Sequence, residues 1–275
     1  MIKVWLKMLD ILLEEFHFST MWNGGILLFI LFGVIIYLFI LPEDKNHKWW
    51  RTILFFTGLI ILFISIGSPL NVIGRIQFST HIIQIVLLLL FAPPLLIIGF
   101  KKKTMEKILS IPVLAKIMRV ITNPIAAIIL FYLLFYGYHI PVIFNNARID
   151  LYLNYFYLLA LFIAAFLLWI PIISSNRLHQ KQKRYYIIAN IVLLIPYSLL
   201  LLLAKDVLYM IYTDVDMFIS ALAVCLPDFQ DIPKEFFQAI MPFNPAEEQP
   251  KGGWILLVSQ LVIFGFSLFM TEKNK

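Results

Sequence analysis

The chain has 275 residues, of which 61% are hydrophobic and only 14% are charged. Soluble domains are typically about half apolar and about a quarter charged, so this composition excludes an ordinary soluble domain. The single cysteine, Cys225, excludes an intrachain disulfide and a cysteine-rich metal site. The net charge of +6 is no evidence for nucleic-acid binding, because in a membrane protein the positions of the charges matter more than their sum.

The apolar residues form blocks long enough to cross a bilayer. They predict an all-α membrane protein, a seven-transmembrane-helix bundle in one polytopic domain over residues 1–275. Residues 1–20, apolar and charged at helical spacing, are expected to form a surface helix. The acidic, proline-rich loop 205–252 contains an apolar run, Met217 to Leu226, that is too short to span. The predicted spans are 22–42, 51–68, 77–99, 119–139, 152–173, 185–204 and 253–270.

The distribution of basic residues predicts the orientation. If the loops alternate, the segments 43–51, 101–119, 174–184 and 271–275 share one side and hold 15 of the 22 lysines and arginines, with 4 of the 16 acidic residues. Cytoplasmic loops carry the excess of Lys and Arg, which predicts an outer N-terminus and a cytoplasmic C-terminus. Tryptophans near span ends, Trp169 among them, are typical of the membrane interface.

The stretch from Ser68 to Phe100 organises the prediction. After a turn, its apolar run carries His81 and Gln84, and residues three apart share a helical face. Polar side chains on one face of a span usually face the bundle interior and mark a functional site. His81 lies only about 6 Å below the outer start of its helix. His139 ends the fourth span, so the two imidazoles are predicted to lie at a similar depth.

Imidazoles at one level between helices can bind copper or zinc. Two nitrogen ligands bind weakly, so His81 and His139 are expected to form at most a transient or shared site. A third ligand would come from His17, a methionine or a partner subunit. Ring nitrogens more than about 10 Å apart would exclude joint ligation, since zinc–nitrogen bonds are about 2 Å. The alternative is that each imidazole hydrogen-bonds a nearby carbonyl or hydroxyl. Soft side chains that could add to a copper site, or simply pack, are Met210, Met217 and Cys225.

Other chemistries lack their residues. The sequence has no phosphate-binding glycine-rich loop, no H-E-x-x-H motif and no nucleophile elbow. A transporter or channel would need a polar path, and the predicted span cores offer only Asn154, Asn190, Gln260 and a few hydroxyls. No Asp or Glu lies in a predicted span core, which weighs against proton-coupled transport. We therefore predict that the chain is not an enzyme.

Short motifs along nearly the whole chain resemble, in the same order, those of the CtaG family of bacterial cytochrome c oxidase assembly factors. Each motif is weak alone, but six in order on a seven-span plan are specific. They are Phe18-Ser19-Thr20-Met21-Trp22; Gly67-Ser68-Pro69-Leu70; Phe78-Ser79-Thr80-His81-Ile82-Ile83-Gln84 with Ala92-Pro93-Pro94-Leu95; His139-Ile140-Pro141 with Asn146-Ala147; Trp169-Ile170-Pro171; and Glu248-Gln249-Pro250-Lys251-Gly252-Gly253.

The chain also departs from the family pattern. The family's third span commonly reads H-M-x-Q-H, whereas Ile82 and Ile85 stand here in place of the Met and the second His. The family tends to carry histidines at the start of the fifth span, where this chain has Tyr152, Asn154 and Tyr155. The side chains suited to bind a metal are therefore fewer than in the family.

The resemblance implies a protein of the bacterial plasma membrane that aids maturation of a haem-copper oxidase. Copper delivery on the outer side is the expected step, and oxidase subunits are the expected partners. The alternatives are a structural partner of oxidase subunits that binds no metal, and a small-molecule transporter or channel. We expect the loop 205–252 to lie over the outer mouth of the bundle, and the two glycines to allow close approach and unusual φ. The expected structural and polar site comprises Gln84, Glu248, Gln249, Gly252 and Gly253.

Overall fold

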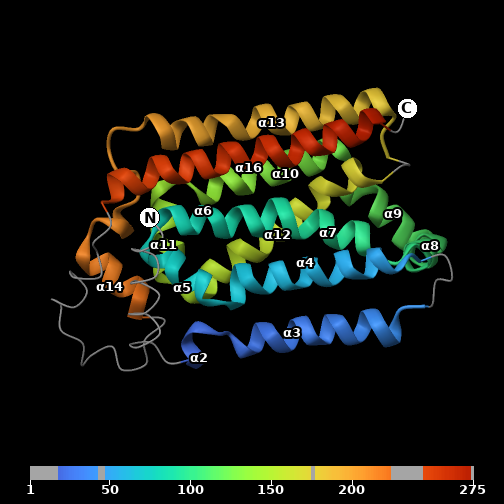
Figure 1. The fold of residues 1–275 in the computed structure, drawn as a ribbon, viewed down its shortest axis with the longest axis horizontal. Coiled ribbons are helices and arrows are strands. Elements are labelled where there is room, and N and C mark those ends of the chain that lie inside the picture. The colour runs from blue at the N-terminus through green and yellow to red at the C-terminus, as the bar shows by residue number, and fades with distance from the viewer. Residues whose placement is uncertain (1–17, 43–46, 175–176, 224–243, 274–275) are drawn as a thin grey trace.

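The computed structural model describes residues 18–42, 47–174, 177–223 and 244–273. Throughout these ranges the regular elements are helices, with no strand (Figure 1). Five of the helices begin at a proline, whose missing N–H costs no hydrogen bond in the first turn. The elements are α2 (Phe18–Met21), α3 (Gly24–Ile35), the π-helical η1 (Ile36–Ile40), α4 (Trp49–Gly67), α5 (Pro69–Ile76), α6 (Phe78–Val86), the π-helical η2 (Leu87–Phe91), α7 (Ala92–Gly99), α8 (Lys102–Ser110), α9 (Pro112–Ile121), α10 (Pro124–Tyr138), α11 (Pro141–Ile149), α12 (Leu151–Ile173), α13 (Gln180–Leu203), the 3₁₀ turn η3 (Met210–Tyr212), α14 (Val215–Ala223) and α16 (Pro245–Lys273).

The described helices confirm a multi-pass membrane protein. Five are long and apolar enough to cross a bilayer, or six if one bent pair forms a single span. The five are Trp49–Gly67, Phe78–Gly99, Leu151–Ile173, Gln180–Leu203 and Pro245–Lys273. The remaining predicted span, 22–42, corresponds to a shorter apolar helix, Gly24–Ile40, so the count of seven stays a prediction.

The bent pair lies where the sequence predicted one continuous span over 119–139. Helix α9 ends at Ile121, α10 begins at Pro124, and their axes differ by 56°. Pro124 cannot continue the hydrogen bonds of α9, and the Asn123 side chain accepts from the backbone N–H groups of Ile125 and Ala126 to cap α10. A proline preceded by a capping asparagine therefore breaks the span.

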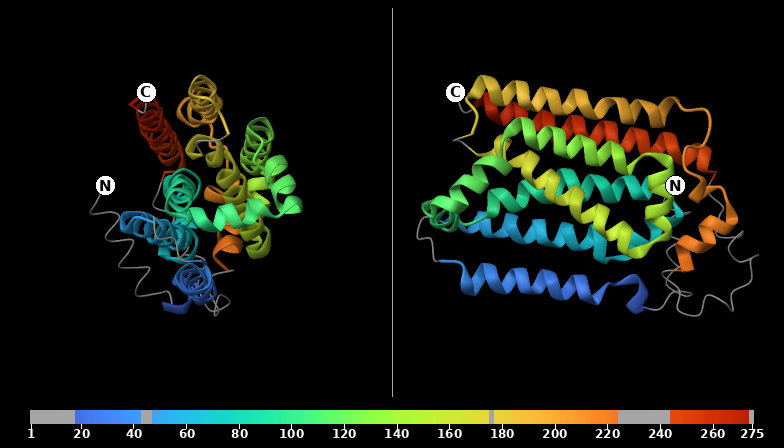
Figure 2. Two further views of the ribbon diagram at one scale, coloured as in Figure 1. Left: turned by 90° about the vertical axis from the view of Figure 1, so that its right-hand side faces the viewer. Right: turned by 180° about the vertical axis from the view of Figure 1, so that it is seen from behind.

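The central helix of the bundle is Phe78–Gly99, formed by α6, η2 and α7. It packs on α4, α12 and α16, and 61% of its apolar window is buried inside the protein, against 22–44% for the other four long helices. Around it, α13 runs along α16, and α10 runs along α12 (Figure 2). The stretch predicted to organise the chain is thus at its centre.

A proline pair shapes this central helix. Pro93 lacks the N–H that would bond the carbonyl of Leu89, and just before it Ala92 N–H bonds the carbonyl of Leu87, five residues back. The Leu89 carbonyl instead accepts from the indole Nε1 of Trp169, at 3.0 Å. Trp169 is 1% exposed and stacks on Phe264, so its indole faces the interior of the protein and not the lipid.

The two ends of the bundle differ. One end carries α8, α9, the start of α13 and the end of α16, and so contains most of the basic residues; the opposite end carries α5, α11 and α14 (Figure 1). At this second end, α5 and α11 connect neighbouring long helices, and both pack against α14. Helix α16 begins at Pro245, eight residues before the predicted span and inside the predicted loop 205–252.

Candidate functional site

The structure brings His81 and His139 together. The ring centroids are 6.2 Å apart, so the ring nitrogens lie within the about 10 Å beyond which they could not share a metal ion. His81 comes from α6 and is fully buried; His139 follows the end of α10 and is 5% exposed. The ring of Phe144 contacts both imidazoles, with centroids 5.1 Å from His81 and 6.1 Å from His139.

Hydrogen bonds fix the tautomer of each imidazole. The Nε2 of Gln84 donates to the carbonyl of Ser65 (2.7 Å) and to Oδ1 of Asn71 (2.9 Å), which leaves Oε1 to accept from Nδ1 of His81 (3.1 Å). The Nδ1 of His139 donates to the carbonyl of Phe135 at 2.7 Å. Both Nε2 atoms are buried without a hydrogen-bond partner. Each imidazole therefore carries its proton on Nδ1 and keeps a lone pair on Nε2.

A chain of polar contacts extends from His81 to the edge of the bundle. From Gln84 it passes to Asn71 on α5, whose Nδ2 lies 3.3 Å from the hydroxyl of Tyr155 on α12. The same hydroxyl accepts from Nδ2 of Asn23, the N-cap of α3, at 3.2 Å. The orientation of His81 thus depends on side chains from α3, α5 and α12 as well as on its own helix.

Two buried arginines lie beside the histidines. Arg75 ends α5 and Arg148 ends α11, and neither is exposed to solvent. Nη1 of Arg75 donates to the carbonyl of Arg148 (2.6 Å) and to that of Ala221 (3.3 Å), which ties α5, α11 and α14 together. The guanidinium of Arg148 lies over the ring of Phe144, 5.9 Å from its centroid. The two imidazoles therefore lie beside two buried positive charges.

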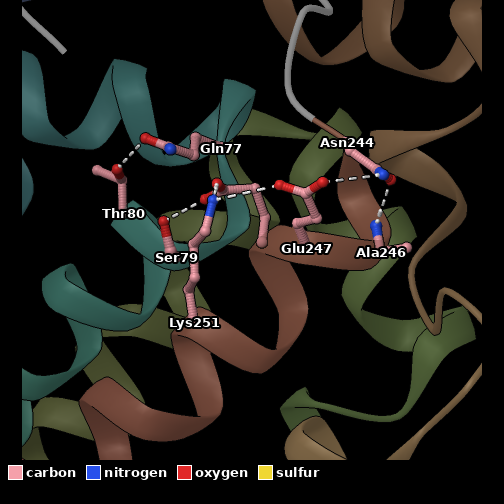
Figure 3. Close-up of polar contacts among 8 residues, drawn as sticks. Gln77, Ser79, Thr80, Asn244, Ala246, Glu247 and Lys251 are labelled. Carbon is pink, nitrogen blue, oxygen red and sulfur yellow. Dashed lines mark hydrogen bonds and ion pairs between the residues drawn. The ribbon is translucent and has the colours of Figure 1, made fainter. Parts of the chain in front are cut away.

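The start of α16 forms a second polar cluster next to α6 (Figure 3). Glu248 is 3% exposed, accepts a hydrogen bond from Ser79 Oγ and pairs with Lys251 Nζ at 2.8 Å. Lys251 also lies 3.8 Å from Glu247. A small cavity beside this cluster is lined by Ile76, Gln77, Phe78, Tyr212, Phe218, Pro245 and Glu248. The buried carboxylate of Glu248 is thus neutralised within the cluster.

Gln249, Gly252 and Gly253 attach α16 to its neighbours. Gln249 accepts from the backbone N–H of Leu208 (2.9 Å) and donates to the carbonyl of Asp206 (3.3 Å). Both glycines are buried where α16 approaches other helices closely. No described glycine has positive φ, so close approach, and not the expected unusual φ, is what these two glycines supply.

The described part of the loop 205–252 packs over the histidines. Tyr209 donates to the backbone carbonyl of His139 (3.0 Å), and Tyr212 donates to that of Gly74 (2.9 Å). Ile211 N–H donates to Oδ1 of Asn145 on α11 (3.3 Å). These contacts close the end of the bundle above Phe144.

The described residues contain no group of three or more His, Cys, Asp or Glu that could hold a metal ion. His17 and Cys225 lie outside the described residues, and Met210 is 55% exposed. The two Nε2 lone pairs fit a transition metal, and their Nδ1–H bonds to a side-chain amide and a carbonyl are the kind that orient ligating histidines. Within the described chain the donor set is nevertheless two imidazoles.

The comparisons with known proteins decide the family. Residues 26–271 match the model of the family described as cytochrome c oxidase caa3 assembly factor (Caa3_CtaG). The chain belongs to this family. No curated protein and no solved structure matches the assembly factor. Membership indicates a role in assembling cytochrome c oxidase from within a membrane, in agreement with the resemblance of the sequence motifs.

Of the three positions at the start of the fifth span that depart from the family pattern, two lie at the site. The hydroxyl of Tyr155 accepts from Asn71 in the chain of polar contacts that starts at His81. Asn154 is buried, and its Oδ1 lies 3.5 Å from Nη1 of Arg148. Tyr152 is 86% exposed and contributes nothing to the interior. Two of the three substituted positions therefore hold hydrogen-bonding groups around the histidines.

Sequence reasoning missed Arg75 and Arg148, which it counted only as basic residues of the outer side. The signal available was an arginine in the last turn of a short, proline-initiated apolar segment between two spans, as in Pro69–Ile76 and Pro141–Ile149. Tyr138 and Phe144 were also missed, because aromatic residues are common throughout this chain.

Proposed function

We propose that this assembly factor passes copper towards a haem-copper oxidase through the end of the bundle that holds His81 and His139. The observation that carries the proposal is the pair of buried Nε2 lone pairs on rings 6.2 Å apart. Neutral imidazole is a ligand for copper, and both rings are held in the tautomer that ligation requires.

A two-imidazole donor set suits transfer better than storage. Two nitrogen ligands hold the cargo ion weakly, so a third ligand from an oxidase subunit would complete the coordination and draw copper onward. Only the Nε2 lone pairs of the imidazoles are available to the copper ion, because the Nδ1–H groups donate to Gln84 and to the Phe135 carbonyl. The assembly factor positions the two imidazoles and sets their tautomer, and the oxidase subunit supplies the remaining ligand and the final affinity for copper.

The proposed transfer takes place at the outer face of the bacterial plasma membrane. Supporting this orientation, the described parts of the segments that hold most of the lysines and arginines belong to the end opposite the histidines. In this arrangement Gly24–Ile40 is the first of seven spans, the N-terminus is outside and the C-terminus is cytoplasmic.

The test is oxidase maturation in cells that carry His81→Ala or His139→Ala. Each variant is expected to lower oxidase activity and copper content while its own membrane level is unchanged, and added copper is expected to restore part of the activity. His179→Asn, at the N-cap of α13 on the opposite end, is the matched control, since asparagine also caps helices. Normal maturation in both His→Ala variants would leave the family role intact and favour a structural partner that binds no metal.

A further inference from the structure

Arg148 is a fully buried cation with no acidic partner among the residues that the structure describes. It is 0% exposed, and it forms no ion pair within the part of the chain that the structure describes. Its hydrogen-bond partner is the Asn154 side chain, at 3.5 Å from Nη1. Burying a guanidinium is costly unless an opposite charge or several hydrogen bonds compensate it. Intramembrane and buried charges of this kind mark functional sites.

The N–H groups of Arg148 that have no hydrogen-bond partner lie on one edge of its guanidinium. Nε and Nη2 are both buried without a hydrogen-bond partner. Their N–H groups point in parallel and form the fork that binds two oxygens of one carboxylate or phosphate. The unsatisfied edge is therefore the one that recognises a planar two-oxygen anion.

The surroundings offer neutral hydroxyls instead of a counter-ion. The hydroxyls of Tyr138 and Tyr212 lie close to Arg148 without hydrogen bonds of ordinary geometry to it, and that of Tyr138 is buried without any partner. Burial raises the pKa of Tyr212 to about 12, against the lowering effect of the nearby Arg148 charge. Tyr212 therefore stays neutral at physiological pH and does not compensate the guanidinium.

Tyr212 also connects this region to the small cavity at the same end of the bundle. Its side chain lines that cavity together with Phe78 and Glu248. The carboxylate of Glu248 is paired with Lys251, so it does not close the cavity to anions.

We propose that Arg148 is the anchor of a carboxylate-binding site, in which one carboxylate bonds Nε and Nη2 and accepts from the Tyr138 hydroxyl. The carboxylate belongs either to a free small acid or to an acidic side chain of a protein partner. The site is separate from the imidazole lone pairs, so it holds whether or not the histidines carry copper.

The experiment measures thermal unfolding of the full chain, purified in detergent without added metal, in potassium acetate against potassium chloride at equal ionic strength. Acetate is the probe, and inorganic phosphate is a second arm because it also binds arginine bidentately. At about ten times its dissociation constant, acetate is expected to raise the Tm by a few degrees. A peptide with one glutamate, compared with its glutamine counterpart, serves as the arm for a protein carboxylate. A shift with acetate but none with the glutamate peptide assigns the site to a free acid, and a shift with both admits a side chain.

Arg148→Met is expected to lose the acetate shift, Arg148→Lys to keep less than half of it, and Arg119→Met, an exposed arginine on α9, to retain it in full. The proposal is overturned if acetate does not raise the Tm of the wild-type chain. If Arg148→Met does not fold, an acetate-induced Tm shift in Arg148→Lys equal to that of the wild type overturns it as well. A shift with phosphate alone overturns the assignment to a carboxylate. Because none of these measurements involves oxidase activity, their failure is distinct from failure of the copper proposal.

Discussion

An alanine in place of Gly253 would press a methyl group against α13. The added Cβ would lie 2.9 Å from Leu202 Cγ, 3.0 Å from Leu201 Cβ and 3.0 Å from the carbonyl oxygen of Ser198. The carbonyl belongs to helical backbone and cannot rotate away, so α13 and α16 would have to separate. Gly265 lies on the same helix, and a Cβ there would meet no atom within 4 Å, which makes Gly265→Ala the matched control.

The expected changes in the free energy of unfolding have opposite signs for the two variants. Overpacking a close helix contact costs about 1–3 kcal/mol, whereas Gly→Ala in an open helix position gains up to about 1 kcal/mol. The two variants should therefore differ by about 1–4 kcal/mol, with Gly253→Ala below the wild type and Gly265→Ala at or above it. For a chain of this size that difference corresponds to about 2–15 °C in Tm.

The assay is thermal unfolding of purified protein in detergent, followed by tryptophan fluorescence and by size-exclusion of the heated sample. Equal Tm values for the two alanine variants would refute the reasoning, because the contact of α16 with α13 would then be loose.

At the neighbouring position, Gly252→Leu should lower accumulation and Tm more than Lys251→Ala. A Cβ on Gly252 already lies 3.0 Å from Ile82 Cγ1 and 3.1 Å from the Phe78 ring. Lys251→Ala removes a lysine that is 43% exposed and leaves Glu248 its hydrogen bond from Ser79.

Two further predictions concern function and topology. Gln84→Leu removes the donor to Ser65 and Asn71 and the acceptor for His81. Each buried group left unsatisfied costs about 1–3 kcal/mol, so the variant should lower both Tm and oxidase maturation. Gln182→Leu, which removes an exposed capping contact to the N–H of His179 at the opposite end, should leave maturation unchanged; normal maturation in Gln84→Leu would show that the orientation of His81 is unimportant. In a Cys225→Ser background, an impermeant thiol reagent added outside intact cells should label Lys205→Cys and leave Lys102→Cys unlabelled; strong labelling at position 102 would reverse the orientation.

The sequence was sufficient to predict the structural class, the family and the similar depth of the two histidines. Apolar blocks of span length have few alternatives to membrane helices, and helical geometry places His81 and Gln84 on one face without knowledge of the fold. His139 could be placed at the same depth because alternating spans fix which end of each helix shares a side. The contact with His81 could not be deduced from helix packing, because α6 and α10 are not among the extensively packed helix pairs, and His139 lies beyond the end of α10.

The parts that could not be predicted depend on how segments between the spans return to the bundle. Arg148 would be solvated in an extended loop, but α11 packs against α12 and α14 and buries it. The burial of Trp169 depends on Leu89, 80 residues away in the chain. The break at Asn123 lies within an apolar stretch whose average hydropathy is that of a span, so span length alone does not reveal it.

The hydrogen bond from Trp169 to the Leu89 carbonyl couples the energetic effects of the proline pair and the tryptophan. Replacing Pro93 by alanine would ordinarily be expected to stabilise a helix, since it restores an N–H donor and removes a steric clash. Here the restored N–H would have to share the Leu89 carbonyl with the indole. A buried indole N–H deprived of its acceptor costs about 1–3 kcal/mol, which can cancel the gain. The irregularity in the central helix is therefore matched by a donor on another helix, and the effects of changing the two residues are not additive.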